Sequence, residues 1–549
     1  MAVAVGIYYH WGVRAAGYDI VWGRDAGGYY DYLGRAFAGG HLYLPLEPSP
    51  QLLAQPDPWD PRVDDSLKLF DAALFNRRYY LYHGAGPAVM LFAPYRLLAR
   101  HDLPENFALF LFCFGGFLFS AGALSALLRL LRAEVRPITQ ALMLLALGVC
   151  QAVPFLLNRV WVYEVAIGGG YFCVAAALFF LVRSFASAKL GWLVAAGLMF
   201  GMAVSCRPHL AIVGAVALAA VGFGSRRRGL ALGLPLLLVG MGIGAYNYAR
   251  FGNPLEFGNR YLLGSANQTE LRLSRANVAP GLYYMLLSPP EFSPVFPWVR
   301  LPAQARDIPR PASYTVEPTV GALWLAPFLP GIVLVFLARR GRVLLWIPIA
   351  SAALVLLFIA GTGWSTERYE VDFLGLAILG TLGAFAAVAG RGRGQSVLLG
   401  VLIVAGAVAN LSIAISGPYD EMLQNRPARY VSIARWFSPI AKYRPALNPP
   451  VAAHVTAAGG TQLLFRAGRK PFRYELSIEG PAGKRSLVSR YHEATVTQPL
   501  DAAADPLEFD FRYVPDTGEM RVASAGRVVL VHRIGALVTA PADIAVNPR

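Results

Sequence analysis

The stretch LGWLVAAGLMFGMAVSCRPHLAIVGAVALAAVGFGSRRR (residues 190–228) decides the fold class. Two apolar runs, 190–205 and 208–224, are separated by a short polar break and followed by three arginines. Apolar runs of about 17 to 25 residues with few charges are long enough to cross a bilayer as helices. The stretch therefore predicts two membrane-spanning helices joined by a tight turn.

Similar runs recur through most of the chain. Of the 549 residues, 56% are hydrophobic and 15% are charged, against about half and about a quarter in soluble domains. We expect spans at 105–128, 138–157, 160–182, 190–205, 208–224, 229–249, 318–338, 343–361, 373–390 and 396–416. We interpret the short apolar piece 1–13 as a first span clipped by a late start site. The sequence thus predicts an α-helical polytopic membrane protein with about eleven transmembrane helices.

The net charge of +16 would suit a nucleic-acid partner, but the positions of the basic residues argue against one. They cluster in alternate short loops, and Lys and Arg beside spans stay on the cytoplasmic side. These loops hold Arg129, Arg132, Arg136, Arg183, Lys189, Arg226, Arg227, Arg228, Arg339, Arg340, Arg342, Arg391 and Arg393. The N-terminus is then cytoplasmic and the C-terminus extracytoplasmic. Segment 82–98 fits this alternation only as an interfacial or re-entrant helix.

Two chemistries find no support in the sequence. The four cysteines form neither a CxxC pair nor a zinc spacing, so we interpret them as small buried hydrophobic residues. The loops predicted to be cytoplasmic are short, and no G-x-x-x-x-G-K-[ST] motif occurs. ATP-driven chemistry by this chain alone is therefore not expected.

The pattern of the sequence changes after residue 416. Prolines mark 417–450 as a linker with a short helix near 430–437. Between 451 and 549, short alternating runs such as FRYELSIEG (472–480) predict an extracytoplasmic β-sandwich-like domain. Such a domain would either bind sugar or serve as a structural cap.

The first outer region, 14–104, places a carboxylate directly after the first apolar piece. Asp25 in WGRDAGGYYDYLGRAFAGG (22–40) is expected at the membrane surface. A half-buried position there raises the pKa of a carboxyl group and suits a general base. The alternative is a helix N-cap. The candidates for binding a sugar substrate in this region are Tyr29, Tyr30, Trp59, Asp60 and Tyr82.

A group of aspartates in QPDPWDPRVDD (55–65) is the one candidate cofactor site. Mg²⁺ and Ca²⁺ take carboxylate oxygens as ligands, so a divalent cation is the cofactor to consider. The prolines between the acids favour a solvated turn instead, and the spacing matches no EF-hand loop. The candidate ligands are Asp57, Asp60, Asp64 and Asp65.

Basic residues at the outer ends of spans are candidates for binding a phosphate. Arg207, Arg250 and Arg368 occupy such positions, and the guanidinium fork matches phosphate oxygens. Arg207 could instead be an interfacial anchor, and Arg250 is open to a structural role.

The stretch WSTERYEVDF (364–373) packs four charges between two apolar runs. In a helix, Arg368 and Asp372 lie one turn apart and can pair. Glu370 would benefit from the helix N-terminus. We add Glu370 and Asp372 to the candidate substrate-binding residues.

Together these residues resemble a known family. The first feature is an acid after the first span, Asp25, followed by a helix that contains Tyr29. The others are the motifs NRRYYLYHGAGP (76–87), RFGNPLEFGNRY (250–261) and ERYEVDF (367–373). They resemble the polytopic GT-C glycosyltransferases, among them RgtA/B/C/D-like enzymes, protein O-mannosyltransferases and aminoarabinose transferases.

The resemblance covers about 1–416 and carries expectations for the site. It implies a polyprenyl-phosphate sugar as donor, inversion at the anomeric carbon, and Asp25 as general base on the acceptor hydroxyl. It also implies that Arg368, Arg207 and Arg250 bind the lipid phosphate. The family often has two adjacent acids where this chain has Asp25–Ala26. One carboxylate suffices as the base, because a phosphate leaves without needing a proton.

We therefore expect a glycosyltransferase in the inner membrane of a bacterium, with its tail outside the cytoplasm. The acceptor would be a glycan, a lipid or a protein. One alternative is a transporter or exporter, for which inverted repeats and charges near mid-membrane would be expected. Another is a sugar-binding membrane assembly protein, which would leave the acidic first region unexplained.

Overall fold

The computed structural model divides the chain into two units. One comprises Met1–Arg14, Tyr18–Glu291 and Leu301–Ala414, and the other Ala15–Gly17, Phe292–Arg300 and Ile415–Arg549. The residues described are 1–187, 189–264, 273–292, 296–302, 305–388, 392–418, 421–437, 451–457, 461–468, 473–481, 484–491, 494–500, 507–514, 517–535, 537 and 544–548.

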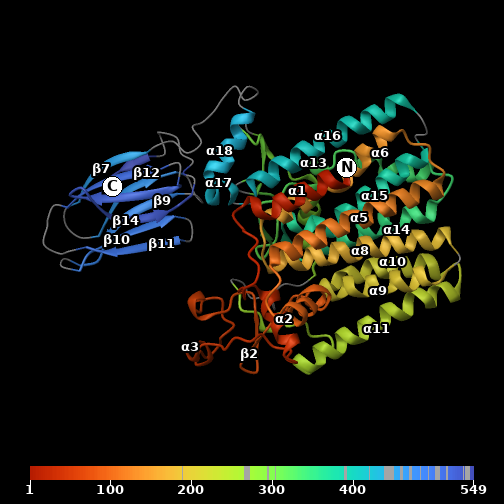
Figure 1. Cartoon of the computed structure of the whole chain (residues 1–549), viewed down its shortest axis with the longest axis horizontal. Helices are drawn as coiled ribbons and strands as arrows, with labels where there is room; N and C mark the ends of the chain where they lie inside the picture. Colours follow the sequence, from red (N-terminus) through yellow and green to blue (C-terminus); the bar gives the residue numbers. More distant parts are fainter. Residues whose placement is uncertain are drawn as a thin grey trace. The chain divides into compact units, whose positions relative to one another are not determined.

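The first unit is built mainly from helices (Figure 1). They are α1 (Ala2–Ala15), α2 (Tyr29–Ala38), α3 (Pro50–Leu53), α4 (Ala93–Ala99), α5 (Glu105–Leu131), α6 (Pro137–Val149), α7 (Val153–Asn158), α8 (Val162–Ala186), α9 (Gly191–Cys206), α10 (Ala211–Gly222), α11 (Arg226–Phe251), α12 (Arg275–Leu282), α13 (Ala322–Leu325), α14 (Arg342–Gly361), α15 (Val371–Val388) and α16 (Arg393–Ser416). Short strands before residue 366 are β1 (Ala73–Phe75), β2 (Arg78–Tyr80), β3 (Glu291–Phe292), β4 (Val299–Arg300), β5 (Thr315–Val316) and β6 (Trp364–Ser365).

Six helices in the described part of the chain are long and apolar enough to cross a membrane. They are Glu105–Leu131, Val162–Ala186, Arg226–Phe251, Arg342–Gly361, Glu367–Val388 and Gly394–Ser416. Shorter apolar helices are Ala88–Ala99, Pro137–Val149, Gly191–Cys206 and Pro208–Gly222. These helices confirm the predicted polytopic helical fold. The short apolar helix Ala88–Ala99 overlaps the segment 82–98, for which an interfacial or re-entrant helix was predicted.

Burial ranks these helices from the centre of the bundle to its edge. Of the apolar window of α8, 83% is buried, whereas the corresponding share of α11 is 11%. Helix α9 packs between them, and a Cβ atom at Gly197 would lie only 2.1 Å from the carbonyl oxygen of Leu232. Small residues permit such close approach between membrane helices. Helix α11 is therefore a peripheral helix that presents apolar side chains outward.

One predicted span is wrong as a continuous helix. Within 318–338, helix α13 ends after four residues, and a 3-10 helix covers Leu329–Leu337. Pro327 and Pro330 lie at this break. Each proline lacks the N–H that would continue the helical hydrogen bonds. The predicted span 138–157 is likewise divided into α6 and α7, with Pro154 in the first turn of α7.

The part of the second unit from residue 415 on contains two helices, α17 (Glu421–Asn425) and α18 (Pro427–Trp436), and nine strands in its described residues; strand β4 also belongs to this unit. The strands are β7 (Ala452–Ala457), β8 (Gln462–Ala467), β9 (Tyr474–Glu479), β10 (Ser486–Tyr491), β11 (Ala494–Pro499), β12 (Leu507–Val514), β13 (Glu519–Ser524), β14 (Arg527–Arg533) and β15 (Ile544–Val546). Helix α18 confirms the helix predicted near 430–437, while 438–450 of the predicted linker lie outside the described residues.

The strands form two antiparallel sheets, ordered β11-β10-β9-β8-β15 and β14-β13-β12-β7. Alternate residues of β12 point into one shared core, which includes Phe465 from the first sheet and Phe509 and Phe511 from the second. The period-two pattern places one side of each strand inward. The predicted β-sandwich-like domain is confirmed.

Candidate functional site

A cavity of about 340 Å³ lies where the ends of several helices of the first unit meet. The start of α8, the turn after α9, the end of α14 and the 3-10 helix Glu367–Glu370 all contribute to its wall. We call it the arginine cavity. It is lined by Tyr82, Tyr163, Arg207, His209, Asn259, Leu273, Phe358, Ile359, Thr362, Trp364, Arg368 and Tyr369. Three of the predicted substrate-binding residues, Tyr82, Arg207 and Arg368, are thus brought together.

Arg368 is fixed in this cavity by Glu317. Strands β5 and β6 pair in parallel, and the backbone N–H of Glu317 continues the pairing by donating to the Ser365 carbonyl at 2.9 Å. This register places the Glu317 carboxylate beside Arg368, whose Nη2 and Nη1 lie 3.0 and 2.9 Å from its two oxygens. The guanidinium also lies 4.7 Å from the ring centroid of Tyr163. A bidentate pair of this kind holds both side chains in one geometry.

Arg207 is held from the other side by Asp372. Its Nη2 lies 2.8 Å from Oδ2 of Asp372, and Nε2 of His209 lies 3.0 Å from the same oxygen. The His209 ring stacks on Phe358 at 5.6 Å. The prediction that Arg368 pairs with Asp372 is wrong, because each of these residues has a partner from a distant segment. Arg368 and Asp372 therefore form ion pairs with residues far away in the sequence instead of with each other.

Arg207 and Arg368 act on a buried histidine near the cavity. The pKa of His83, which packs against Tyr163 at 4.8 Å, falls to about 3. Burial is the main cause, and the charges of Arg207 and Arg368 lower it further. His83 is therefore neutral at physiological pH. Each of these two cations is already paired with a carboxylate, so an anion that enters the cavity must compete for them with Asp372 and Glu317.

A buried carboxylate lies behind the aromatic wall. Asp71 is in hydrogen-bonding contact with the Tyr163 hydroxyl group and lies within the field of Arg368. Burial raises the pKa of Asp71, while the Tyr163 hydrogen bond and Arg368 lower it less strongly. Asp71 was not singled out from the sequence. Its one signal was that it closes the acidic stretch directly before the apolar strand β1.

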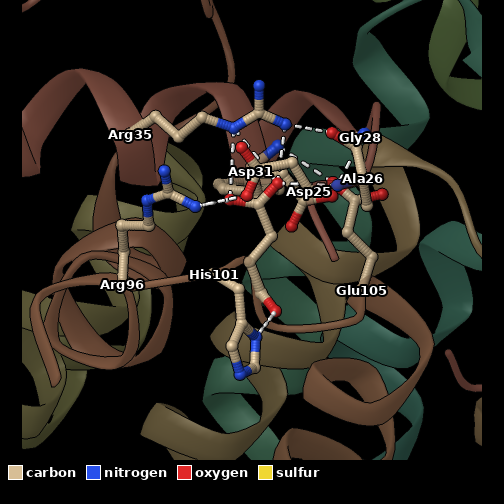
Figure 2. Close-up of polar contacts among 10 residues, drawn as sticks. Asp25, Ala26, Gly28, Asp31, Arg35, Arg96, His101 and Glu105 are labelled. Carbon is tan, nitrogen blue, oxygen red and sulfur yellow. Dashed lines mark hydrogen bonds and ion pairs between the residues drawn. The ribbon is translucent and has the colours of Figure 1, made fainter. Parts of the chain in front are cut away.

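Asp25 lies elsewhere, in a group of charged residues around α2 and α4 (Figure 2). Its carboxylate pairs with Arg96 and its side chain is 53% exposed. The Arg96 hydrogen bond lowers the pKa of Asp25, so the expected rise of this pKa is wrong. Asp25 is not an N-cap either, because α2 begins after Gly28. The structure does not place Asp25 among the residues that line the arginine cavity.

The interior of this charged group is made by other acids (Figure 2). Asp102 accepts from Arg35, with Nη2 at 2.6 Å from Oδ2. Asp31 accepts from the Gly28 backbone N–H at 3.1 Å, and its second oxygen is buried without a partner among the described residues. Burial raises the pKa of Asp31, with help from Glu105 and Asp102. These contacts fix the start of α2.

The two predicted tyrosines of α2 donate hydrogen bonds to backbone carbonyl groups. Tyr29 donates its hydroxyl to the carbonyl of Phe70, and Tyr30 donates to the carbonyl of Gly84 at 3.0 Å. Burial raises the pKa of both hydroxyl groups. Neither ring lines the arginine cavity.

The aspartates of 55–65 accept backbone hydrogen bonds within turns or pair with basic side chains nearby. Asp57 and Asp64 accept backbone N–H groups at 3.0 and 2.9 Å, and Asp60 pairs with Arg62, which lowers the pKa of Asp60 to about 2. Asp65 lies 3.4 Å from Lys68. No group of three or more potential metal ligands is found among the described residues. Trp59 is partly exposed and donates its ring N–H to the Leu74 carbonyl at 3.2 Å.

The remaining candidates are buried away from the cavity. Arg250 donates to the Leu81 carbonyl and to Asn247, both at 2.7 Å. It thereby ties the end of α11 to the segment after β2. Glu370 is fully buried next to Glu367, which accepts the backbone N–H of Val320 at 2.7 Å. Neither side chain lines the arginine cavity.

Comparison with known proteins gives two structural likenesses. No family model matches the sequence, and no curated protein matches it. The chain is similar to ArnT from Cupriavidus metallidurans bound to undecaprenyl phosphate, with 16% identity, a TM-score of 0.44, and coverage of 81% of each chain. It is also similar to the apo oligosaccharyltransferase of Archaeoglobus fulgidus, with 14% identity and a TM-score of 0.34, over 84% of this chain and 61% of that one. Both belong to the GT-C class that the sequence resembles. At these identities and TM-scores the likeness assigns no residue and no reaction to this chain.

Proposed function

We propose that the protein transfers a sugar from a polyprenyl-phosphate donor to an extracytoplasmic acceptor, with inversion at the anomeric carbon. The site is the arginine cavity, and the host membrane is the inner membrane of a bacterium. The observation that carries the proposal is the placement of two guanidinium groups, Arg207 and Arg368, in one cavity at the ends of apolar helices. A ligand with a phosphate and a long apolar chain matches both features.

The cavity supplies the interactions that such a donor needs. Two guanidinium forks can bind the phosphate oxygens and stabilise the charge that grows as the phosphate leaves. The flat rings of Tyr82, Trp364 and Tyr369 suit the apolar faces of a sugar. In the reaction, the acceptor oxygen bonds to the anomeric carbon while the carbon–oxygen bond to phosphate breaks. The phosphate keeps the electron pair, and a base takes the proton of the acceptor.

Two carboxylates are candidates for that base. The family resemblance implies Asp25, which is paired with Arg96. The second candidate is Asp71, which lies behind the cavity wall, contacts the cavity-lining Tyr163 and has a raised pKa. A base with a raised pKa takes a proton more readily at neutral pH.

The test is turnover of a panel of polyprenyl-phosphate sugars by the purified protein, followed by mass spectrometry. Arg368→Ala and Arg207→Ala should weaken donor binding, while Asp71→Asn should bind the donor and lose turnover. If Asp25→Asn alone loses turnover, the transferase stands and the base is Asp25. Absence of both binding and turnover in the wild type would overturn the proposal.

A further inference from the structure

A second basic cavity lies at the other ends of α8 and α9. Its volume is about 250 Å³, and it is formed by the last turn of α8 and the first turns of α9 and α11. We call it the basic pocket. The residues that matter here are Ser184, Ser187, Lys189, Leu193, Arg227 and Arg228. It is separate from the arginine cavity, with which it shares no residue.

All three charged residues of the basic pocket are cations. Arg228 is held in place by the Ser184 carbonyl and hydroxyl at 3.1 and 3.2 Å, and it lies over the Phe185 ring. Lys189 and Arg227 are exposed. Within the described ranges none of the three forms an ion pair with a carboxylate. Like charges gathered around one space repel each other unless an anion enters.

The backbone adds to this positive charge. Helices α9 and α11 both begin at the pocket and bring the positive ends of two helix dipoles to it, while α8 ends there with its negative end. Acidic residues are the usual occupants of a first helical turn, yet α11 starts with Arg226, Arg227 and Arg228. The first turn of α9 has no side-chain cap. The two helix N-termini and the three cations therefore favour an anionic ligand.

We infer that the basic pocket binds the phosphate of an anionic phospholipid headgroup. The two helices that begin at the pocket also carry exposed apolar side chains that acyl chains could contact. Val194 and Leu198 on α9, and Leu230 and Leu234 on α11, are exposed within the next two helical turns. The alternation of basic loops predicts that this end faces the cytoplasmic leaflet, where anionic lipids attract basic residues. Basic pockets between membrane helices bind such headgroups elsewhere.

The experiment is a thermal-unfolding titration of the delipidated full-length protein in detergent. The probes are phosphatidylglycerol, zwitterionic phosphatidylcholine and inorganic phosphate. The wild type should be stabilised by phosphatidylglycerol at concentrations where the other two do little. Lys189→Ala and Arg227→Ala should each weaken this effect about fivefold, since a cation near a lipid surface contributes about one such factor. Arg227→Lys should restore most of it.

Arg340→Ala is the matched control, because Arg340 is an exposed cation of another loop on the same predicted side. If Arg340→Ala weakens the lipid effect as much as Arg227→Ala, general surface charge explains the binding and the site is refuted. Equal stabilisation by inorganic phosphate would assign the pocket to a soluble phosphate instead. If the Lys189 variant fails to fold, native mass spectrometry of lipid retained by Arg227→Ala decides the question.

Discussion

The guanidinium of Arg207 lies 2.8 Å from the carboxylate of Asp372, which links the end of α9 to the first turn of α15. Asp372 is only 1% exposed, so its charge depends on this partner and on His209. The contact joins two apolar helices at the wall of the arginine cavity. The stability of the helix bundle and the shape of the site are therefore coupled at this pair.

Asp372→Ala should reduce the free energy of unfolding by about 3–5 kcal/mol, because it leaves the Arg207 charge buried and unpaired. Unfolding in detergent measures this. Asp307, whose side chain is 95% exposed beside Arg310, is the control. Asp307→Ala should change stability by less than about 1 kcal/mol. Equal effects of the two substitutions would show that the Arg207–Asp372 pair is not structural.

The pH profile should identify the base. If Asp71 is the base, kcat/KM is lost as the pH falls through its raised pKa, so the acid limb lies above the range of an ordinary aspartate. The raised pKa of Asp71 also makes the stability of the protein depend on pH. The neutral form is favoured in the folded state, so stability is greatest below the unfolded pKa and decreases as pH rises to the folded value. Asp71→Asn should remove this decrease, which pH-dependent unfolding curves would reveal.

Arg96→Ala gives an independent test of Asp25. Arg96 lowers the pKa of Asp25, so its removal raises that pKa towards the ordinary value. If Asp25 is the base, the acid limb of kcat/KM moves to higher pH in this variant. An unchanged profile would leave Asp71 as the base. Asp25→Asn should not alter the melting temperature, since the side chain is largely exposed.

Gly84→Ala should disturb the site through packing. A Cβ atom at Gly84 would lie 1.9 Å from the Ser205 carbonyl oxygen, close to Arg207. Overpacking of this kind costs about 1–3 kcal/mol, and the shift of α9 should weaken donor binding. A Cβ atom at Gly240 in α11 would meet nothing within 4 Å beyond the adjoining backbone of its own helix. Gly240→Ala should therefore stabilise slightly, through helix propensity, and leave donor binding unchanged.

Phe509→Ala should destabilise the β-sandwich. Phe509 is fully buried in the core shared by both sheets, and removal of such a ring costs about 3–5 kcal/mol. Limited proteolysis of the full chain should then cut within 451–549 faster than in the wild type. Val528, an exposed residue of β14, is the control, and Val528→Ala should leave the cleavage rate unchanged.

Helices and strands could be predicted because their signals are local. Apolar length gave α5, α8 and α11, and period-two alternation gave β12. Pro327, where the helix breaks, is also plain in the sequence. The span 318–338 was predicted from its average apolar composition, which a single proline hardly changes. Window averages measure transfer to lipid and are insensitive to a missing backbone donor.

The partners inside the site could not be predicted in the same way. Arg207 and Arg368 were predicted to bind the same phosphate, and the structure places both in one cavity and adds the contacts that hold them. Glu317 reaches Arg368 only through the parallel pairing of β5 and β6, which joins segments far apart in the chain. His209 follows Arg207 by two residues in the sequence, but the partner they share, Asp372, lies on another helix.

Because Glu317 already pairs with Arg368, a ligand phosphate can bind Arg368 only by replacing the Glu317 carboxylate. The Glu317 carboxylate already accepts hydrogen bonds from Arg368, Thr366 and the ring N–H of Trp364. A small free anion would have to replace this carboxylate, so the free energy gained by its binding would be nearly offset by the loss of the existing hydrogen bonds. An amphiphilic phosphate brings a second source of free energy, the transfer of its chain into the bilayer. The cavity is therefore expected to work as a filter that ignores inorganic phosphate and admits phosphates carried on lipids.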